Sequence, residues 1–222
     1  MRLRPGTYIE AAALLFDMDG TLINTSGIIN ALWKRWAERH GINPAPIIAS
    51  SSGRRIMDTV AEFLPPGANV DDEVQWIGQR GRDHPEGIVP IPGALELVRS
   101  LPSHRWAVVT AADRTIAEKW LQAAGLPVPR VLITSENVQR GKPDPEGYLM
   151  AAQRLRVNPR DTVVFEDSQP GIAAGRAAGA KVIGIATSLP PEALQGEDWL
   201  ADFTPLAFDT DEGDFQMRLR VY

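Results

Sequence analysis

From residue 105 onward, strand-length apolar runs alternate with segments of helical length. The apolar runs cover residues 105–111, 130–135, 162–167 and 181–187. Each run is apolar on both faces, which is typical of a strand in a parallel sheet that helices cover on both sides. Residues 11–17 have the same character. We therefore expect an α/β fold built on a doubly wound parallel sheet.

The segment that follows the first predicted strand breaks this rhythm. Apolar residues recur there at helical spacing in three segments, residues 25–41, 53–67 and 69–81. We therefore predict a small all-α domain inserted after the first strand. The predicted division is residues 25–87 for a helical cap and residues 1–24 and 88–222 for the α/β core.

The C-terminal residues 205–222 are typical of a β-hairpin. An Asp-Glu-Gly sequence at 211–213 has the composition of a turn. Apolar residues then alternate with polar ones at Phe215, Met217, Leu219 and Val221. We expect two antiparallel strands here.

Composition narrows the class of partner. A net charge of −5 argues against a nucleic-acid-binding protein, and the absence of cysteine excludes disulfides and thiolate metal sites. The apolar run near the N-terminus ends at Asp17 and is too short for a signal peptide or a membrane span. We therefore expect a cytoplasmic protein without a nucleic-acid or membrane partner, as a monomer or a small homo-oligomer.

Polar side chains follow the predicted strands at their carboxyl ends. They are Asp17 and Asp19 after the first strand, Thr110 after the second, and Glu166 and Asp167 after the fourth. In an open α/β sheet these ends meet at one edge, where ligands bind. Lys142 stands on a loop rich in glycine and proline that precedes a predicted helix. We expect four carboxylates, a hydroxyl and a lysine to converge.

Carboxylates that lie close together need a counter-charge, or their pKa values rise. Oxygen ligands without histidine or cysteine suit Mg²⁺. A metal ion, a lysine, a hydroxyl and free backbone N–H groups together bind a phosphoryl group. The sequence therefore predicts a magnesium ion and a phosphate at this edge.

Each motif alone also has a purely structural explanation. Asp-x-Asp-Gly-Thr at 17–21 is compatible with a strand followed by a turn, and Thr110 with a helix cap or a strand residue. Lys142 is compatible with an ordinary loop lysine. The acids at 166–167 are compatible with the N-terminal end of a helix, where the helix dipole favours negative charge. The functional interpretation depends on all four motifs occurring in this order.

Four segments, "FDMDGTLIN", "VVTAADR", "GKPDPEGY" and "VVFEDSQPGI", together resemble the four motifs of the haloacid dehalogenase superfamily. The resemblance covers nearly the whole chain. It implies a Rossmann-like core, and the helical insertion occupies the position of that superfamily's small cap. Within the superfamily, the chain is similar to phosphatases that act on sugar phosphates and glycerol phosphate.

The resemblance implies a role for each matching residue. Asp17 would attack phosphorus and form an aspartyl-phosphate, and Asp19 would act as general acid and then general base. Mg²⁺ would be held by the Asp17 carboxylate, the Asp19 backbone carbonyl and the Asp167 carboxylate. Glu166 would be either a further metal ligand or a partner of the ligands.

The resemblance also implies residues that bind the substrate. Thr110, the N–H of Ala111 and Lys142 would contact phosphoryl oxygens. On the cap, Arg54 and Arg55 are the candidates for contacting the leaving group, or they stand in a solvated first turn of a helix.

The implied activity is hydrolysis of a small phosphorylated metabolite, a sugar phosphate or a polyol phosphate such as glycerol phosphate. Two alternatives stay open. "EDSQPGI" also resembles the fourth motif of β-phosphoglucomutases, which return the phosphoryl group to the sugar. A non-catalytic phospho-acceptor switch also combines acids, a threonine and a lysine, but such proteins are shorter and lack a helical insertion.

Overall fold

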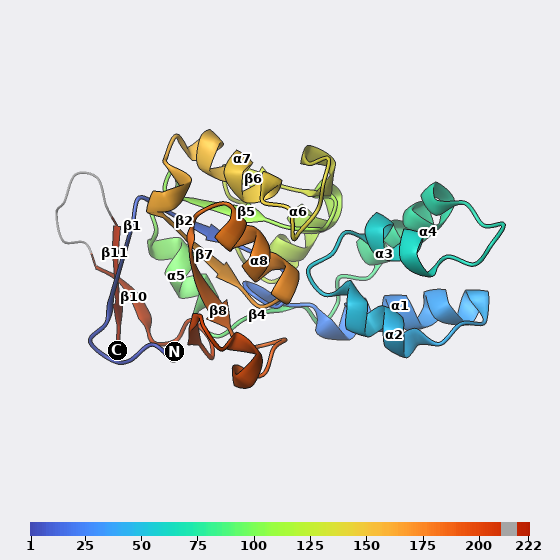
Figure 1. The fold of residues 1–222 in the computed structure, drawn as a ribbon, viewed down its shortest axis with the longest axis horizontal. Coiled ribbons are helices and arrows are strands. Elements are labelled where there is room, and N and C mark those ends of the chain that lie inside the picture. Colours follow the sequence, from blue (N-terminus) through green and yellow to red (C-terminus); the bar gives the residue numbers. More distant parts are fainter. Residues whose placement is uncertain (210–216) are drawn as a thin grey trace.

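The computed structural model describes residues 1–209 and 217–222 (Figure 1). Its main sheet has six strands in the order β6-β5-β2-β7-β8-β9, and each neighbouring pair is parallel. These strands are β2 (Ala13–Phe16), β5 (Trp106–Val109), β6 (Val131–Ile133), β7 (Thr162–Glu166), β8 (Lys181–Ile185) and β9 (Asp198–Leu200). The predicted α/β fold with a parallel sheet is confirmed.

Helices pack on both faces of this sheet. They are α5 (Ala94–Ser100), α6 (Arg114–Ala123), α7 (Glu146–Leu155) and α8 (Gln169–Ala177). Alternate residues of β2 divide between two apolar clusters, Leu14 and Phe16 with α5 and α6, and Leu15 with α7 and α8. The two clusters explain why the strands had to be apolar on both faces. Three short 3₁₀ helices complete this part, at Ser135–Asn137, Pro159–Asp161 and Pro191–Leu194.

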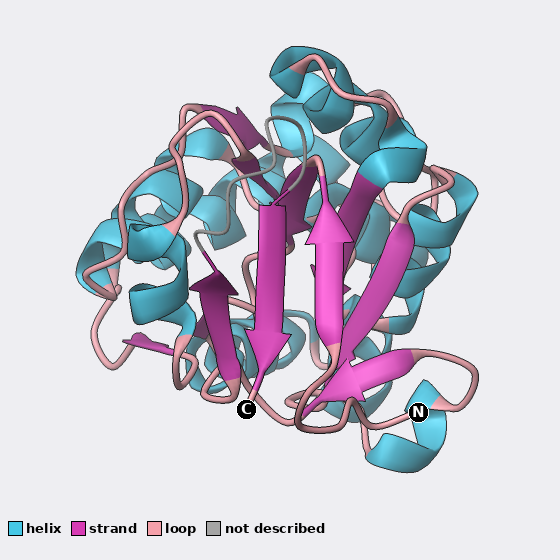
Figure 2. Cartoon of the chain, turned by 90° about the vertical axis from the view of Figure 1, so that its left-hand side faces the viewer, coloured by secondary structure: helices cyan, strands magenta, loops and turns pink. Residues whose placement is uncertain are grey.

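The first predicted strand divides into two strands that belong to different sheets. β1 (Tyr8–Ala11) pairs antiparallel with β11 (Met217–Val221), which also pairs antiparallel with β10 (Leu206–Asp209). Figure 2 views the molecule from the side of this three-stranded sheet. The division falls at Ala12, whose N–H donates to Asp161 O at 2.7 Å instead of to a strand partner. The strand predicted over 11–17 is therefore present as β2 over Ala13–Phe16, and Ala11 belongs to β1 instead.

The predicted C-terminal hairpin has its two strands, since β10 and β11 pair antiparallel. Met217, Leu219 and Val221 point to the buried side, as their alternation indicated. The predicted turn at 211–213 and Phe215 lie outside the described residues.

Four helices form a bundle beside the sheet (Figure 1). They are α1 (Ser26–His40), α2 (Pro44–Ser51), α3 (Ile56–Phe63) and α4 (Val70–Asp83). Their own apolar cluster includes Trp33, Trp36, Ile47, Val60 and Ile77. Helix α2 was not expected from the apolar spacing. It begins with Pro44 behind Asn43, whose side chain accepts the N–H of Ala45 at 3.0 Å.

The two connections of the bundle to the core lie side by side. β3 (Ile23–Asn24) and β4 (Val89–Pro90) pair antiparallel as a two-stranded ribbon. The chain therefore enters and leaves the bundle at one place.

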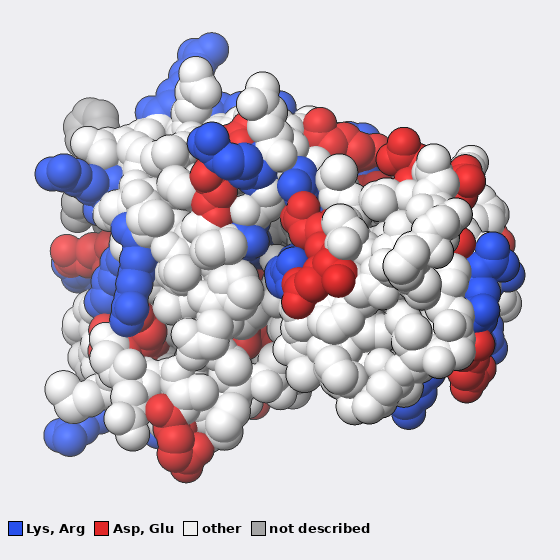
Figure 3. Space-filling model, turned by 45° about the vertical axis from the view of Figure 1, so that its right-hand side comes forward, with Lys and Arg blue, Asp and Glu red and all other residues white. Residues whose placement is uncertain are grey.

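Charges are mixed on the surface. On the face drawn in Figure 3, acidic and basic side chains are interspersed rather than gathered by sign. Within residues 1–209 and 217–222, no helix is long and apolar enough to cross a membrane.

A buried carboxylate joins α1 to α4. Trp36 Nε1 donates to Glu73 Oε2 at 2.9 Å, and His40 Nε2 lies 3.0 Å from the same oxygen. Burial disfavours the charged form of Glu73, but its contacts with His40 and Trp36 outweigh this and place its pKa below the ordinary value. The ionised carboxylate thus stabilises the bundle.

Replacing Glu73 by glutamine is expected to lower the free energy of unfolding by about 1–2 kcal/mol at neutral pH. The stabilisation by Glu73 is present above its ordinary pKa of 4.5 and is lost as the pH falls through the lower folded pKa. The difference between the two proteins should therefore narrow below pH 4.5. Urea unfolding over this pH range measures it, with the exposed Glu38→Gln as control. If the difference in free energy of unfolding did not change with pH, the stabilising role of the ionised Glu73 carboxylate would be contradicted.

Candidate active site

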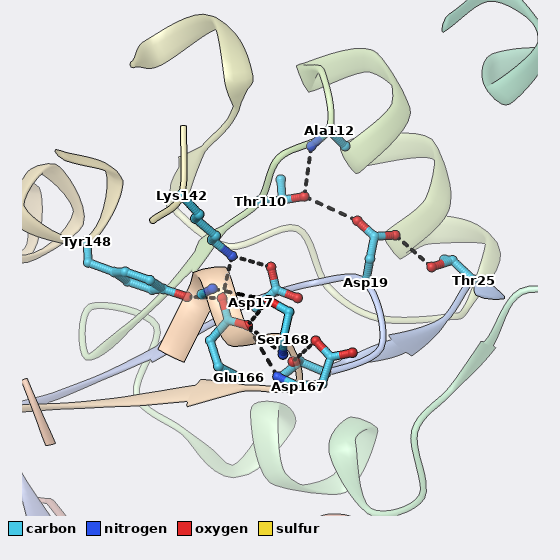
Figure 4. A network of polar contacts seen from close by, with 12 residues as sticks. Asp17, Asp19, Thr25, Thr110, Ala112, Lys142, Tyr148, Glu166, Asp167 and Ser168 are labelled. Atoms are coloured by element: carbon cyan, nitrogen blue, oxygen red, sulfur yellow. Dashed lines mark hydrogen bonds and ion pairs between the residues drawn. The ribbon is translucent and has the colours of Figure 1, made fainter. Parts of the chain in front are cut away.

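The predicted site residues meet at the carboxyl ends of β2, β5 and β7 (Figure 4). Asp17 follows β2 directly, Thr110 follows β5, and Glu166 ends β7. The structure brings these three together with Asp19, Lys142 and Asp167. The convergence that strand order required is therefore observed.

Lys142 bridges two carboxylates from different strands. Its Nζ lies 2.5 Å from Asp17 Oδ1 and 2.5 Å from Glu166 Oε1. Only 6% of the Lys142 side chain is exposed, and Glu166 is fully buried. The two acids raise the pKa of Lys142 against the effect of its burial, so it stays charged.

Both oxygens of Glu166 are occupied by protein donors. Oε1 accepts the Tyr148 hydroxyl at 2.7 Å in addition to Lys142. Oε2 accepts the Ser168 hydroxyl at 3.0 Å and the N–H groups of Asp167 and Ser168. A Cβ at position 171 would lie 1.8 Å from Oε1, so only glycine leaves room for this carboxylate. Glu166 therefore acts as a fixed support for the lysine.

Asp19 lies beside two threonine hydroxyls. Thr25 donates to Oδ1 at 2.8 Å and Thr110 donates to Oδ2 at 3.3 Å. Burial outweighs these hydrogen bonds and raises the pKa of Asp19 to about 6. A carboxyl with such a pKa is suited to hold a proton and then release it.

Three carboxylates form a group that could hold a divalent metal ion. One oxygen each from Asp17, Glu166 and Asp167 lie within 4.8 Å of one another, and all three residues are buried. Burial and the neighbouring acids raise the pKa of Asp17 well above its ordinary value and that of Asp167 to about 7. A divalent cation would favour the ionised forms and remove this cost.

Backbone conformation brings Asp167 close to the first motif. Gly20 has a φ of +81°, and a Cβ there would lie 2.0 Å from Asp167 Oδ2. The Thr21 hydroxyl donates to Asp167 Oδ1 at 3.3 Å. The Asp-Gly-Thr sequence is thus required by packing against the fourth motif, not merely by a turn.

A cavity of about 540 Å³ lies between the bundle and the core and includes Asp17 and Asp19 in its lining. Ala111, one of the predicted phosphate-binding residues, also lines it. Thr110 accepts the N–H of Ala112 at 3.1 Å, which orients its hydroxyl toward Asp19. The carboxylates of Asp17 and Asp19 therefore open into a space large enough for a small ligand.

The two cap arginines differ in where they lie. Arg54 lines the cavity, with its guanidinium held by Glu62 at 2.5 Å and by Ser50. Arg55 does not line this cavity. Its guanidinium forms two hydrogen bonds with Asp58, at 2.7 and 2.8 Å.

The remaining hydrogen bonds of Arg55 cross from the bundle to the core. NH1 donates to the carbonyls of Val138 and Gln139 at 3.3 and 3.1 Å. These carbonyls belong to the loop that continues to Lys142. The geometry thus shows Arg55 linking the bundle to this loop. Its contact with a leaving group stays a prediction.

Replacing Arg55 by alanine is expected to reduce kcat/KM by about tenfold or more, to the same extent for a bulky substrate and a small aryl phosphate. The reason is that the variant loses the contact to the Lys142 loop while the cavity lining stays intact. Steady-state kinetics on both substrates measure it, with Met57→Ala on the exposed face of α3 as control. A loss of kcat/KM confined to the bulky substrate would instead show that Arg55 contacts the leaving group.

Two residues of the site were missed by sequence reasoning. Tyr148 ends the "GKPDPEGY" segment, and a buried tyrosine needs a partner for its hydroxyl, which is a usable signal. Thr25 stands at the N-cap position of helix α1, but its side chain makes no capping hydrogen bond and donates to Asp19 instead. No signal in the sequence distinguishes these two roles.

A family model described as haloacid dehalogenase-like hydrolase matches residues 11–179. Hexitol phosphatase A of Escherichia coli (strain K12) is 35% identical, over 80% of this chain and 84% of that protein. Glycerol-1-phosphate phosphohydrolase 2 of Saccharomyces cerevisiae is 36% identical, over 84% of this chain and 79% of that protein.

Solved structures agree with the sequence relatives. A HAD family hydrolase from Deinococcus radiodurans R1, with bound phosphate and sodium, is 30% identical and has a TM-score of 0.61. The similarity covers 85% of this chain and 90% of that one. With its parallel sheet, its acid cluster and these relatives, the chain belongs to the haloacid dehalogenase-like hydrolase family.

Proposed function

We propose that this protein is a Mg²⁺-dependent phosphatase that hydrolyses a sugar phosphate or a polyol phosphate through an aspartyl-phosphate on Asp17. The observation that carries the proposal is a pair of carboxylates at one cavity that are held by different partners. Lys142 lies 2.5 Å from Asp17 and favours its ionised form, against burial and the neighbouring acids, which raise the pKa of Asp17. Two threonine hydroxyls hold Asp19, whose pKa is raised to about 6. Relatives named as phosphatases, at about 35% identity, support the same reaction class.

The residues present fit a magnesium ion. The Asp17 and Asp167 carboxylates and the Asp19 backbone carbonyl would hold it, and these are the oxygen ligands that Mg²⁺ prefers. The bound ion would supply positive charge that offsets the phosphate and the acids. We assign Glu166 to Lys142 rather than to the metal, because both of its oxygens already accept protein hydrogen bonds.

In the first step, an Asp17 carboxylate oxygen forms a bond to phosphorus while the bond from phosphorus to the ester oxygen breaks. The departing oxygen takes the proton from Asp19. Thr110, the Ala111 N–H and Lys142 would bind the phosphoryl oxygens and stabilise the charge that develops on them. Lys142 is already positioned for this contact. Glu166 holds the lysine at 2.5 Å, and the Tyr148 hydroxyl donates to Glu166 and fixes that carboxylate.

In the second step, the Asp19 carboxylate takes a proton from a water molecule, whose oxygen attacks phosphorus. The bond between phosphorus and Asp17 breaks, inorganic phosphate leaves, and both aspartates return to their starting forms. One hard displacement is thereby divided into two easier ones.

We also propose the domain division given above, with residues 25–87 as a cap over the active site. The bundle has its own apolar cluster and joins the core through the β3–β4 ribbon, which supports these bounds. The cytoplasmic location, the small oligomeric state and the absence of a nucleic-acid partner stay predictions from the sequence.

The decisive experiment measures inorganic phosphate released from a panel of metabolite phosphates by the purified protein with Mg²⁺ and with EDTA. We expect release only with the divalent ion. A protein that instead interconverts glucose phosphates without releasing phosphate would be a mutase, and the proposal would be wrong.

The variant Asp19→Ala should still bind phosphate but should release almost none from substrate. This result would show that Asp19 acts in the reaction and is not needed to bind the phosphate group.

A further inference from the structure

The cavity beside Asp17 and Asp19 has an apolar wall, which we define as Ile29, Trp33, Ile77, Ile116 and Trp120. These residues come from α1, α4 and α6, so the bundle and the core both contribute. The indole N–H of Trp120 donates to Gly81 O at 3.0 Å and is therefore not free for a ligand. Trp33, Ile77, Ile116 and Trp120 are nearly fully buried, so the half-buried Ile29 presents most of the open surface of this wall.

Three charged side chains line the cavity among the described residues, two acids and one cation. Asp17 and Asp19 are its acids, and Arg54 is its one cation among the described residues. Arg54 is already paired with Glu62 at 2.5 Å, bonded to Ser50, and donates to Asp58 O at 3.3 Å. A second anionic group on the substrate would lose its hydration and find no uncommitted cation here.

Hydroxyl groups can be accommodated on another side of the cavity. Ser50, Ser51 and Ser52 line it at the end of α2, and Asn30 lines it from α1. The volume of about 540 Å³ is in the range that buries ligands of drug size. A three-carbon polyol would fill only a small part of this volume.

We propose that the alcohol part of the substrate is an uncharged ring of hexose size or larger, with one apolar face against Ile29 and its hydroxyls toward the serines. The inference rests on the proposed phosphatase activity and narrows its substrate class. It selects against substrates with a second phosphate or a carboxylate, and against short polyols.

Three pairs of substrates separate size, polarity and charge. Glucose 6-phosphate against glycerol 3-phosphate tests size, and 2-deoxyglucose 6-phosphate against glucose 6-phosphate tests one hydroxyl. Glycerol 3-phosphate against 3-phosphoglycerate replaces an alcohol by a carboxylate at nearly constant size. We expect kcat/KM to be at least about tenfold higher for the ring and for the uncharged member, and not higher for the deoxy sugar, which has lost a hydroxyl that could face the serines.

Variants place the effect in the cavity. Ile29→Lys adds a cation to the apolar wall, and Ile48→Lys adds one beside the serines, in case the first variant does not fold. Each is expected to raise the ratio of kcat/KM for 3-phosphoglycerate over glycerol 3-phosphate by at least about tenfold. Met57→Lys, exposed on α3 and outside the lining, should leave the ratio unchanged.

The outcomes distinguish the two proposals. Phosphate release that is equal or faster with 3-phosphoglycerate, or with glycerol 3-phosphate than with the hexose phosphate, would overturn the substrate class and leave the phosphatase intact. A folded protein that releases phosphate from no substrate would overturn the proposed function and this inference with it. The expected order of kcat/KM values, together with the expected effect of the two lysine variants, would support both the proposed function and the substrate class.

Discussion

Asp17→Asn is expected to lower kcat by more than about a hundredfold while the protein stays folded. An amide has the same shape as the carboxylate but is too weak a nucleophile to form the bond to phosphorus. The fold is retained because Lys142 keeps its second partner, Glu166, at 2.5 Å. Phosphate release and thermal unfolding of the same preparation measure the two effects.

The matched control for this variant is Asp71→Asn, an aspartate on the exposed first turn of α4. It makes the same chemical change far from the cavity and should leave kcat unchanged. If Asp17→Asn retained more than about a hundredth of the wild-type kcat, covalent catalysis by Asp17 would be contradicted.

Lys142→Met is expected to lower the free energy of unfolding by about 3–5 kcal/mol near pH 8 and to abolish activity. Methionine has a similar length but leaves Asp17 and Glu166 buried without their counter-charge. Burial disfavours the charged form of an acid, so the variant's folded state should bind more protons than its unfolded state. Its free energy of unfolding should therefore fall as pH rises. The difference in free energy of unfolding between wild type and variant should shrink as the pH is lowered.

Urea unfolding in EDTA at several pH values tests this expectation, since EDTA keeps a cation from replacing the lysine. Lys34→Met on the exposed face of α1 is the control and should change stability little. If Lys142→Met lowered the free energy of unfolding only slightly, or by an amount that does not depend on pH, the lysine would not neutralise these acids.

The parallel sheet could be predicted from the sequence because its strands are apolar on both faces. The approach of Asp17 to Asp167 was expected because the carboxyl ends of parallel strands meet at one edge of a sheet, and the structure shows that β2 and β7 are neighbours there. Helix α2 could not be predicted, because eight residues with prolines at 44 and 46 carry too little apolar spacing. The division at Ala12 depends on β11, which is about two hundred residues away along the chain and provides no local signal.

Side-chain direction was the part of the site that the sequence could not provide. Arg54 and Arg55 are adjacent, and only the folded chain shows that one lines the cavity while the other reaches the Val138 and Gln139 carbonyls. Thr25 likewise turns from its helix to Asp19. These outcomes depend on contacts between segments far apart in sequence, where local preference does not decide.

The β3–β4 ribbon would make the proposed cap a replaceable part of the protein. Because the chain leaves at Asn24 and returns at Val89, directly across a hydrogen-bonded pair, a foreign insert would need only two closely spaced ends. The lysine and the acids all come from outside that insert. Grafting another helical bundle between these two points would therefore change which alcohol is accepted while the machinery for breaking the ester remains in place.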